Sequence, residues 1–169
     1  MADCSIPTPD DRSLIDERDY DWMRIALGEA ERAQAAGEVP VGAIIVRDGI
    51  ELARGYNAPI ACCDTTAHAE IVAIRRACAA IGNYRLAGAT LYCTLEPCAM
   101  CAGAISHARI KRVVYGADDF RAGAAHSIFE IFDEPRLNHR VAHVGGVLAA
   151  DSAQLLRTFF RARRRMRSS

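Results

Sequence analysis

Residues 89–116 have the sequence ATLYCTLEPCAMCAGAISHARIKRVVYG, and this stretch decides the fold class. The apolar and aromatic run over 89–94 predicts a buried strand. Pro97 suits the first turn of a helix that the pattern continues to Ala108. Another strand is predicted over 112–116. A strand, a helix and a further strand in succession indicate the α/β class.

The rest of the chain repeats this alternation of helices and strands. Asp48-Gly49 is typical of a tight turn between two strands. Helices are predicted from Asp19 to Gly37, over 68–80 and over 151–165, with strands over 41–46, 51–56 and 141–144. We expect one domain over 19–169, built as a three-layer α/β/α sandwich, after a loose acidic tail over 1–18.

The composition is that of an ordinary globular protein. The chain has 169 residues, of which 51% are hydrophobic and 25% are charged. No apolar run approaches the roughly 18 residues of a membrane helix. The acidic N-terminus lacks the basic region followed by an apolar region that is typical of a signal peptide. An odd count of seven cysteines favours reduced thiols over disulfides. We therefore expect a cytoplasmic protein without a membrane partner.

The formal net charge of +0 hides an uneven distribution of charge. Acidic residues dominate positions 1–21, whereas arginines dominate the far end of the chain. These arginines are Arg157, Arg161, Arg163, Arg164, Arg165 and Arg167. Such a run is either a solvated helix end or a surface for phosphate groups, because local charge sets affinity for nucleic acid.

Two short motifs supply the groups of a metal site. His68 stands two residues before Glu70, and Cys98 and Cys101 form a Cys-x-x-Cys pair further along. The two thiols share one face of the predicted helix, in its first turn, where the helix dipole favours thiolate. One imidazole and two thiolates suit zinc, and three protein ligands leave a fourth position for water, as in catalytic sites. Glu70 is placed to move protons between that water and a substrate.

Each motif also has a simpler interpretation. A lone Cys-x-x-Cys pair occurs in redox proteins, although the context of a thioredoxin-like motif is not evident here. His68 alone would be taken as a capping or core histidine, and Glu70 alone as an acid that complements the helix dipole. The candidate N-caps of this helix are Asp64, Thr65 and Thr66. The two motifs in combination favour zinc.

The segment His68-Ala69-Glu70, followed by Pro97-Cys98-Ala99-Met100-Cys101, matches the H-x-E…P-C-x-x-C signature of the zinc nucleobase and nucleoside deaminases. Beyond this signature, the chain resembles the bacterial tRNA adenosine deaminases from about Tyr20 to about Arg165. The further stretches that carry the resemblance are Gly37-Glu38-Val39-Pro40-Val41-Gly42-Ala43, Thr66-Ala67-His68-Ala69-Glu70-Ile71, Asn83-Tyr84-Arg85-Leu86, Thr94-Leu95-Glu96-Pro97-Cys98, Cys101-Ala102-Gly103-Ala104, Gly123-Ala124-Ala125 and Asn138-His139-Arg140.

The resemblance implies a cytidine-deaminase-like fold with a mixed five-stranded sheet, and a homodimer with one zinc ion per subunit. It implies hydrolytic deamination of adenosine to inosine at the wobble position of a tRNA anticodon stem-loop. It further implies that Glu70 takes a proton from the attacking water and delivers it to the ring nitrogen and then to the leaving ammonia, without binding zinc.

The pocket for the target base is also assigned by resemblance. Asn57 matches an asparagine that hydrogen-bonds the base, and its amide can donate and accept at once. The backbone of Ala69 is expected to contact the base, and Val41 and Leu95 are expected to wall the pocket. Apart from the resemblance, Asn57 is interpreted as a turn residue before Pro59.

Contacts with the rest of the anticodon loop are assigned to two regions. Asp119 falls where the family has an acid that contacts a ribose, and a carboxylate that accepts from a 2′-hydroxyl would help to distinguish RNA from DNA. Phe160, Arg161, Arg163 and Arg164 on the last helix are expected to meet the flanking nucleotides by stacking and phosphate pairing.

The chain departs from the family pattern at three positions. Thr65 stands where a proline is usual, which removes some stiffness before His68. Asp118 is an acid where a neutral or basic residue is expected. His126 replaces a usual glycine, which costs free energy if that position needs a positive φ. These changes bear on the contacts with RNA more than on the chemistry.

Two other functions share the zinc signature. A deaminase of free guanine, cytosine or cytidine is one. The features that favour RNA over it are the Asn83-Tyr84-Arg85-Leu86 stretch, the Asp119 loop and the arginines of the last helix. A degenerate zinc-binding partner subunit is the other, and Glu70 argues against it, because such a subunit needs no group for proton transfer.

Overall fold

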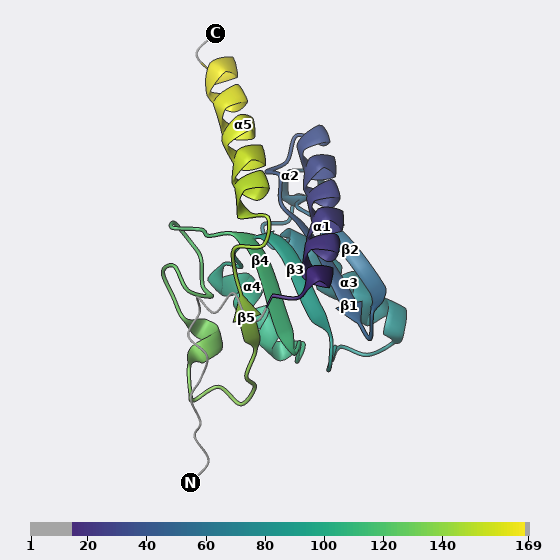
Figure 1. Ribbon diagram of the computed structural model, residues 1–169. Helices are drawn as coiled ribbons and strands as arrows, with labels where there is room; N and C mark the ends of the chain where they lie inside the picture. The colour runs from purple at the N-terminus through teal and green to yellow at the C-terminus, as the bar shows by residue number, and fades with distance from the viewer. Residues whose placement is uncertain (1–14, 168–169) are drawn as a thin grey trace.

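The computed structural model describes residues 15–167, which form one sheet with helices on both faces (Figure 1). The sheet has five strands in the order β2-β1-β3-β4-β5. Their bounds are Gly42–Arg47 (β1), Ile50–Tyr56 (β2), Thr90–Leu95 (β3), Arg112–Ala117 (β4) and Ala142–Val144 (β5). β1 is antiparallel to both β2 and β3, whereas β4 is parallel to β3 and to β5. The predicted mixed five-stranded sheet is confirmed.

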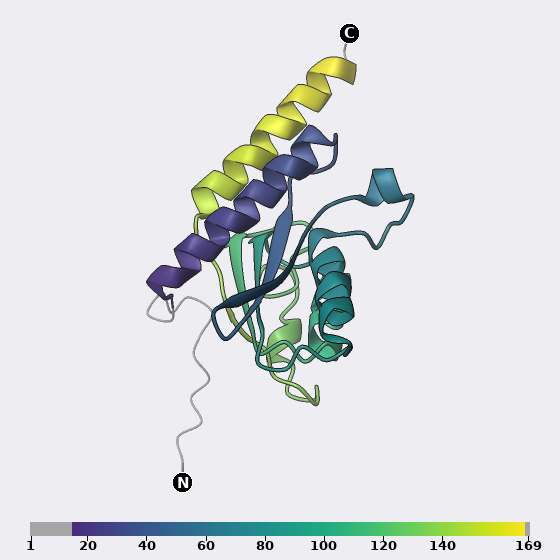
Figure 2. The same ribbon diagram turned by 90° about the vertical axis from the view of Figure 1, so that its right-hand side faces the viewer.

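The longer helices form two layers, one on each face of the sheet (Figure 2). On one face lie α1 (Glu17–Ala35) and α5 (Ala149–Arg167), and on the other lie α3 (Ala69–Ile81) and α4 (Ala99–His107). Two short elements, α2 (Pro59–Cys62) and the 3-10 helix η2 (Ile131–Asp133), lie in the connections. The three-layer α/β/α sandwich is therefore confirmed. Within residues 15–167, no helix is long and apolar enough to cross a membrane.

The strands supply side chains to a separate core on each face. On β1, Ile44 packs with Met23 of α1, whereas its neighbour Ile45 packs in the core that contains Ala69 and Ala73 of α3. Successive residues of a strand point to opposite faces, so one strand serves both layers. Because all these side chains are fully buried, the hydrophobic effect holds both helix layers against the sheet.

The first turn of α3 lies very close to β2. A Cβ atom at Gly55 would lie 2.7 Å from the carbonyl oxygen of Ala69 and 2.7 Å from the nitrogen of Ala73. Glycine is therefore required where the helix crosses this strand. This close approach sets the position of His68 and Glu70 relative to the sheet.

Some helix boundaries differ from the predicted ones. α1 begins at Glu17 rather than Asp19, because the side chains of Asp16 and Asp19 form a capping box with the backbone of the first turn. The predicted acidic tail over 1–18 is therefore too long at its C-terminal end, and its residues 1–14 lie outside the described part of the chain. α2 has no counterpart among the predicted elements, and Pro59 stands in its first turn.

A buried ion pair fastens α1 to the sheet. The carboxylate of Asp19 accepts hydrogen bonds from Arg112 of β4, with the shorter at 2.7 Å, and from the hydroxyl of Tyr92 of β3 at 2.9 Å. Burial alone would raise the pKa of Asp19, but the hydrogen bonds, above all that from Arg112, lower it. The carboxylate is thus more stable in the folded protein than in the unfolded chain, and it ties the first helix to the middle of the sheet.

We predict that Asp19→Asn lowers the free energy of unfolding by about 3 kcal/mol near pH 7, because Arg112 loses its buried partner. Since the pKa of Asp19 is lowered on folding, its contribution is complete above the unfolded pKa of about 3.9 and is lost as the pH falls through the folded value. Urea unfolding at several pH values should show the two proteins converging in acid. Asp21→Asn, which removes an exposed carboxylate, is the control and should change little. A difference that stays constant from neutral pH to pH 3 would contradict the prediction.

Candidate metal centre and active site

The N-termini of α3 and α4 meet at the predicted metal site. His68 is the N-cap residue of α3, and Cys98 is the N-cap residue of α4, yet neither side chain makes a capping hydrogen bond. The two side chains turn toward each other instead. The Sγ atoms of Cys98 and Cys101 each lie 3.6 Å from Nδ1 of His68. The interpretation of His68 as a histidine whose side chain caps the helix is therefore wrong.

The predicted N-caps of α3 have another role. Asp64 accepts hydrogen bonds from the backbone N–H and the hydroxyl of Thr66, and it forms an ion pair with Arg75. The helix begins after them, at Ala69, so none of the candidates Asp64, Thr65 and Thr66 is its N-cap. These contacts stabilise the turn that leads into His68.

The three predicted ligand atoms have the spacing that zinc requires. They all lie within 4.8 Å of one another. In a tetrahedral site with Zn–N of about 2.0–2.1 Å and Zn–S of about 2.3 Å, a nitrogen and a sulfur lie about 3.6 Å apart, which is the separation found here. Within residues 15–167, this is the only set of three His, Cys, Asp or Glu side chains with such an arrangement. The donor set of one imidazole and two thiols is also one that zinc prefers.

Hydrogen bonds among these groups shift their pKa values. The hydrogen bond from Cys101, with that from His68, lowers the pKa of the Cys98 thiol to about 4. The same bond between the two cysteines, together with burial, raises the pKa of the Cys101 thiol. Cys98 is therefore a thiolate at neutral pH, and binding of a metal ion at this point would release the proton that Cys101 keeps.

Glu70 lies in the first turn of α3, beside the ligand set. Its side chain is buried, and burial raises its pKa to about 7. A carboxyl group whose pKa is near neutrality can accept and donate a proton at ordinary pH. Its carboxylate is not part of the ligand cluster. The position thus suits proton transfer rather than metal binding.

Asn57 and Ala69, both predicted to contact the base, contact each other. Oδ1 of Asn57 accepts a hydrogen bond of 2.9 Å from the backbone N–H of Ala69, and Asn57 is buried. This bond joins the end of β2 to the start of α3, so Asn57 is more than a turn residue before Pro59. The Ala69 N–H is already engaged, which leaves the NH2 group of Asn57 as the donor for a base. Contact of either residue with the base stays a prediction.

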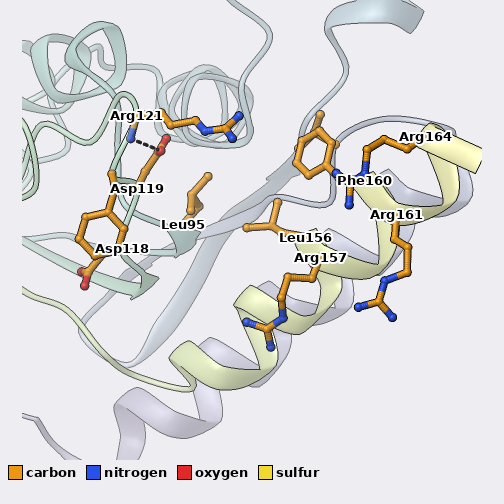
Figure 3. A pocket seen from close by; sticks show the side chains of 11 residues that line it. Leu95, Asp118, Asp119, Arg121, Leu156, Arg157, Phe160, Arg161 and Arg164 are labelled. Carbon is orange, nitrogen blue, oxygen red and sulfur yellow. Dashed lines mark hydrogen bonds between the residues drawn. The ribbon is translucent and has the colours of Figure 1, made fainter.

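A cleft of about 630 Å³ lies between the end of β3, the loop after β4 and α5 (Figure 3). The structure brings Leu95, Asp119 and Phe160, all predicted substrate contacts, to this one surface. Leu95 lies only three residues before the ligand Cys98, so the cleft adjoins the metal motif. The complete lining is Val39, Leu95, Asp118, Asp119, Phe120, Arg121, Leu156, Arg157, Phe160, Arg161 and Arg164.

Arg163 does not reach the cleft. Its guanidinium lies over the ring of Phe159, 5.5 Å from the ring centre, beside a separate hollow that includes Gln34 and Met166. Consecutive residues of an α-helix point about 100° apart, so Arg163 and Arg164 face different ways. The two arginines therefore do not share one surface, and contact of Arg163 with RNA stays a prediction. Val41 is not part of the cleft lining and belongs to the buried core, and its contact with the target base stays a prediction.

Arg157 stands on the cleft face with Phe160, Arg161 and Arg164, although the sequence alone did not assign it to the substrate. The four residues are spaced three and four apart, which is the helical periodicity, and applying it to α5 would have selected Arg157 instead of Arg163. Phe120 and Arg121 also line the cleft, but they lie in an irregular loop where no periodic pattern identifies them.

The three departures from the family pattern have small structural effects. His126 does not adopt a positive φ, and its backbone N–H donates to Glu96 at 2.8 Å, so the expected strain is absent. Asp118 lines the cleft, where it adds negative charge. Thr65 lies in a turn, and α3 still begins at Ala69.

The comparisons with known proteins agree with this geometry. The model of the cytidine and deoxycytidylate deaminase zinc-binding region matches residues 16–117, which contain every ligand. The tRNA-specific adenosine deaminase of Haemophilus influenzae is 51% identical over 154 residues, which cover 90% of this chain and 87% of that protein. That of Agrobacterium fabrum is 49% identical over 143 residues, which cover 85% and 94%.

Solved structures show the same fold. A structure from studies of A-to-I editing by tRNA:A34 deaminases at the wobble position gives a TM-score of 0.78 at 48% identity and covers 80% of this chain and 99% of that chain. A guanine deaminase from Bacillus subtilis gives 0.59 at 36% identity and covers 76% and 83%. The ligand geometry and the matched zinc-binding region together establish zinc as the cofactor. The chain therefore belongs to the tRNA-specific adenosine deaminases and carries the zinc-binding region of the cytidine and deoxycytidylate deaminase family.

Proposed function

We propose that this protein deaminates adenosine to inosine at the wobble position, A34, of a tRNA anticodon stem-loop. The observation that carries the proposal is a zinc ligand set with a buried glutamate beside it, adjoining a cleft lined by three arginines of α5. The relatives that share most of the chain, at 46% to 51% identity, are tRNA-specific adenosine deaminases, which supports the same substrate.

The reaction requires water to add to C6 of the base and ammonia to leave. When held by His68, Cys98 and Cys101, zinc supplies a Lewis acid that lowers the pKa of water toward neutrality. The carboxylate of Glu70 takes a proton from the attacking water and delivers it to ring nitrogen N1. It then moves the second proton to the exocyclic nitrogen, the bond from C6 to that nitrogen breaks, and inosine keeps the oxygen of the water. The near-neutral pKa of Glu70 suits both directions of transfer.

The remaining site residues have roles in binding in this proposal. Asn57 holds the base edge through its amide and keeps the Ala69 backbone in place, while Val41 and Leu95 form the apolar wall beside the base. On the cleft, Asp119 accepts from a ribose hydroxyl. Phe160 stacks with a flanking base, and Arg157, Arg161 and Arg164 meet the phosphates.

Deamination of free guanine is the second candidate, because a guanine deaminase shares the fold at 36% identity. A free base fills only a pocket at the metal site and gives no use to a long basic helix. The cleft beside the site is lined by arginines and by the exposed ring of Phe160, which are the groups that hold single-stranded nucleic acid. The cleft therefore favours RNA.

We also propose that the protein is a homodimer with one zinc ion per subunit and that it acts in the cytoplasm, where tRNA is used in translation. Met100 at the start of α4, and Ile128 and Phe129 before η2, are exposed apolar side chains that support an interface. α4 and η2 pack against each other, so these residues belong to neighbouring elements. A second copy of the chain is the partner proposed to cover them.

The substrate is tested by incubating the zinc-loaded protein with an anticodon stem-loop that carries A34 and analysing the nucleosides. We predict formation of inosine, with no turnover of free adenosine, cytidine or guanine, because binding energy from the flanking nucleotides is needed to hold the base. A stem-loop with G34 is the matched control. Comparable turnover of free guanine would favour the second candidate.

The role of Glu70 is tested by Glu70→Gln, which keeps the shape of the side chain and removes its ability to exchange a proton. We predict that kcat falls at least about a hundredfold, the usual contribution of a general acid–base group. Zinc content, measured on the purified protein, should not change. A variant that retained the wild-type rate would show that another group transfers the protons.

The direction of each arginine on α5 predicts its effect on binding. Arg161→Ala and Arg164→Ala should each weaken binding of the stem-loop and reduce the log–log dependence of affinity on salt by about 0.7 for each phosphate that the variant no longer neutralises. Arg163 is the neighbouring residue and faces away from the cleft. Arg163→Ala is therefore the matched control and should change neither the affinity for the stem-loop nor its dependence on salt. Equal effects of all three substitutions would show that the helix acts through its general charge alone.

A further inference from the structure

One buried carboxylate between the metal motif and the cleft has no part in the chemistry above. Glu96 is only 2% exposed and stands two residues before Cys98. Its carboxylate accepts from a series of donors in the loop after β4. These are the backbone N–H groups of Asp119 at 2.9 Å, Ala125 at 3.1 Å, His126 at 2.8 Å and Ser127 at 2.9 Å, and the hydroxyl of Ser127. Four backbone N–H groups and a hydroxyl thus converge on this side chain, an arrangement that favours the ionised carboxylate.

The two oxygens of Glu96 hold the two ends of the loop. Oε1 accepts from three consecutive N–H groups, those of residues 125–127, which form the concave arrangement of backbone donors that binds anions. Oε2 accepts from the N–H of Asp119, at the start of the loop, and from the Ser127 hydroxyl. A single side chain thus closes the segment 118–127 on itself.

Other contacts press the same loop against the metal motif. The N–H of Ala124 donates to the carbonyl oxygen of Pro97 at 2.8 Å, and Gly123 pairs with Cys98 in an isolated β-bridge. A Cβ atom at Gly123 would lie 2.2 Å from Oε2 of Glu96, so the loop passes directly over the carboxylate. The loop is therefore shaped on residues 96–98, the turn that carries a zinc ligand.

The loop also supplies one wall of the cleft. Asp119, Phe120 and Arg121 line it, and the backbone N–H of Arg121 donates to Oδ1 of Asp119 (Figure 3). We infer that Glu96 is a positioning residue, which holds the 118–127 loop in the conformation that binds RNA next to the zinc ligands. This inference rests on the proposed function. Glu96 acts through the loop and touches neither the base nor the reacting atoms.

Glutamine cannot replace this carboxylate. Its single carbonyl oxygen can serve one end of the loop, and its NH2 group then faces donors at the other end. Buried N–H groups without partners favour loop conformations in which they reach water. If only a fraction of molecules keeps the binding conformation, the apparent affinity falls by that fraction, whereas molecules that do bind react at the normal rate.

The test uses the full-length zinc protein with Glu96→Gln and measures KM and kcat on the A34 stem-loop, zinc content, and amide hydrogen exchange without RNA. We expect KM to rise at least about tenfold, as for a binding conformation kept by about a tenth of the molecules. The kcat and zinc content should be nearly unchanged, and the amides of Asp119 and of residues 125–127 should exchange faster. Glu29→Gln, which neutralises a buried carboxylate on α1, is the matched control and should leave KM and the loop amides unchanged.

Protected loop amides with an unchanged KM in Glu96→Gln would overturn the inference, as would decreases in kcat and zinc content without a change in KM. If Glu96→Gln does not fold, Ser127→Ala decides, since it removes only the hydroxyl donor. Ser127→Ala should raise KM and speed amide exchange at Asp119, both to a smaller extent than Glu96→Gln. If neither quantity changed, the inference would be overturned. Amide hydrogen exchange is measured without substrate. A wild-type protein without deaminase activity would therefore reject the proposed function, whereas the exchange data would still test whether Glu96 holds the loop.

Discussion

The active site depends on one constraint, which is that the N-termini of α3 and α4 must lie close enough for three side chains to reach one ion. His68 and Cys98 are the N-cap residues of these helices, and Cys101 is one turn into α4. The polypeptide between the two motifs includes all of α3 and β3. Only the packing of both helices on the same face of the sheet can bring Nδ1 and the two sulfur atoms within 4.8 Å. The positive ends of two helix dipoles then favour the anionic thiolates.

The rest of the molecule maintains this arrangement from both sides of the sheet. Gly55 allows α3 to lie against β2, and the bond from the Ala69 N–H to Asn57 fixes its first turn. On the opposite face, Asp19 and Arg112 fasten α1 to β4. The turn that carries Cys98 also anchors, through Glu96, the loop that walls the cleft. The chemistry at the metal and the surface for a large substrate are therefore built on adjacent residues of one chain segment.

The sequence predicted those features that local patterns determine. The apolar strand patterns, the helical periodicity and the two metal motifs were enough for the fold class and the ligand set, although α4 begins at Ala99 and Pro97 precedes its N-cap instead of standing in its first turn. It did not predict α2, which is too short for a periodic pattern to emerge. Arg163 was placed with Arg164 because they are neighbours in sequence, whereas the helix turns them apart. The roles of Glu96 and of the bond between Asn57 and Ala69 arise from contacts between distant segments, and no local pattern carries that information.

The most direct test of this account is X-ray absorption at the zinc edge of the purified protein. The account predicts one zinc ion per chain, with two sulfur neighbours at about 2.3 Å and nitrogen or oxygen neighbours at about 2.0–2.1 Å completing a tetrahedral shell. Replacing Cys98 with serine should remove one of the two sulfur neighbours or abolish binding. A shell with three or four sulfur atoms, or a folded protein that takes up no zinc, would contradict the ligand set from which the active site is built.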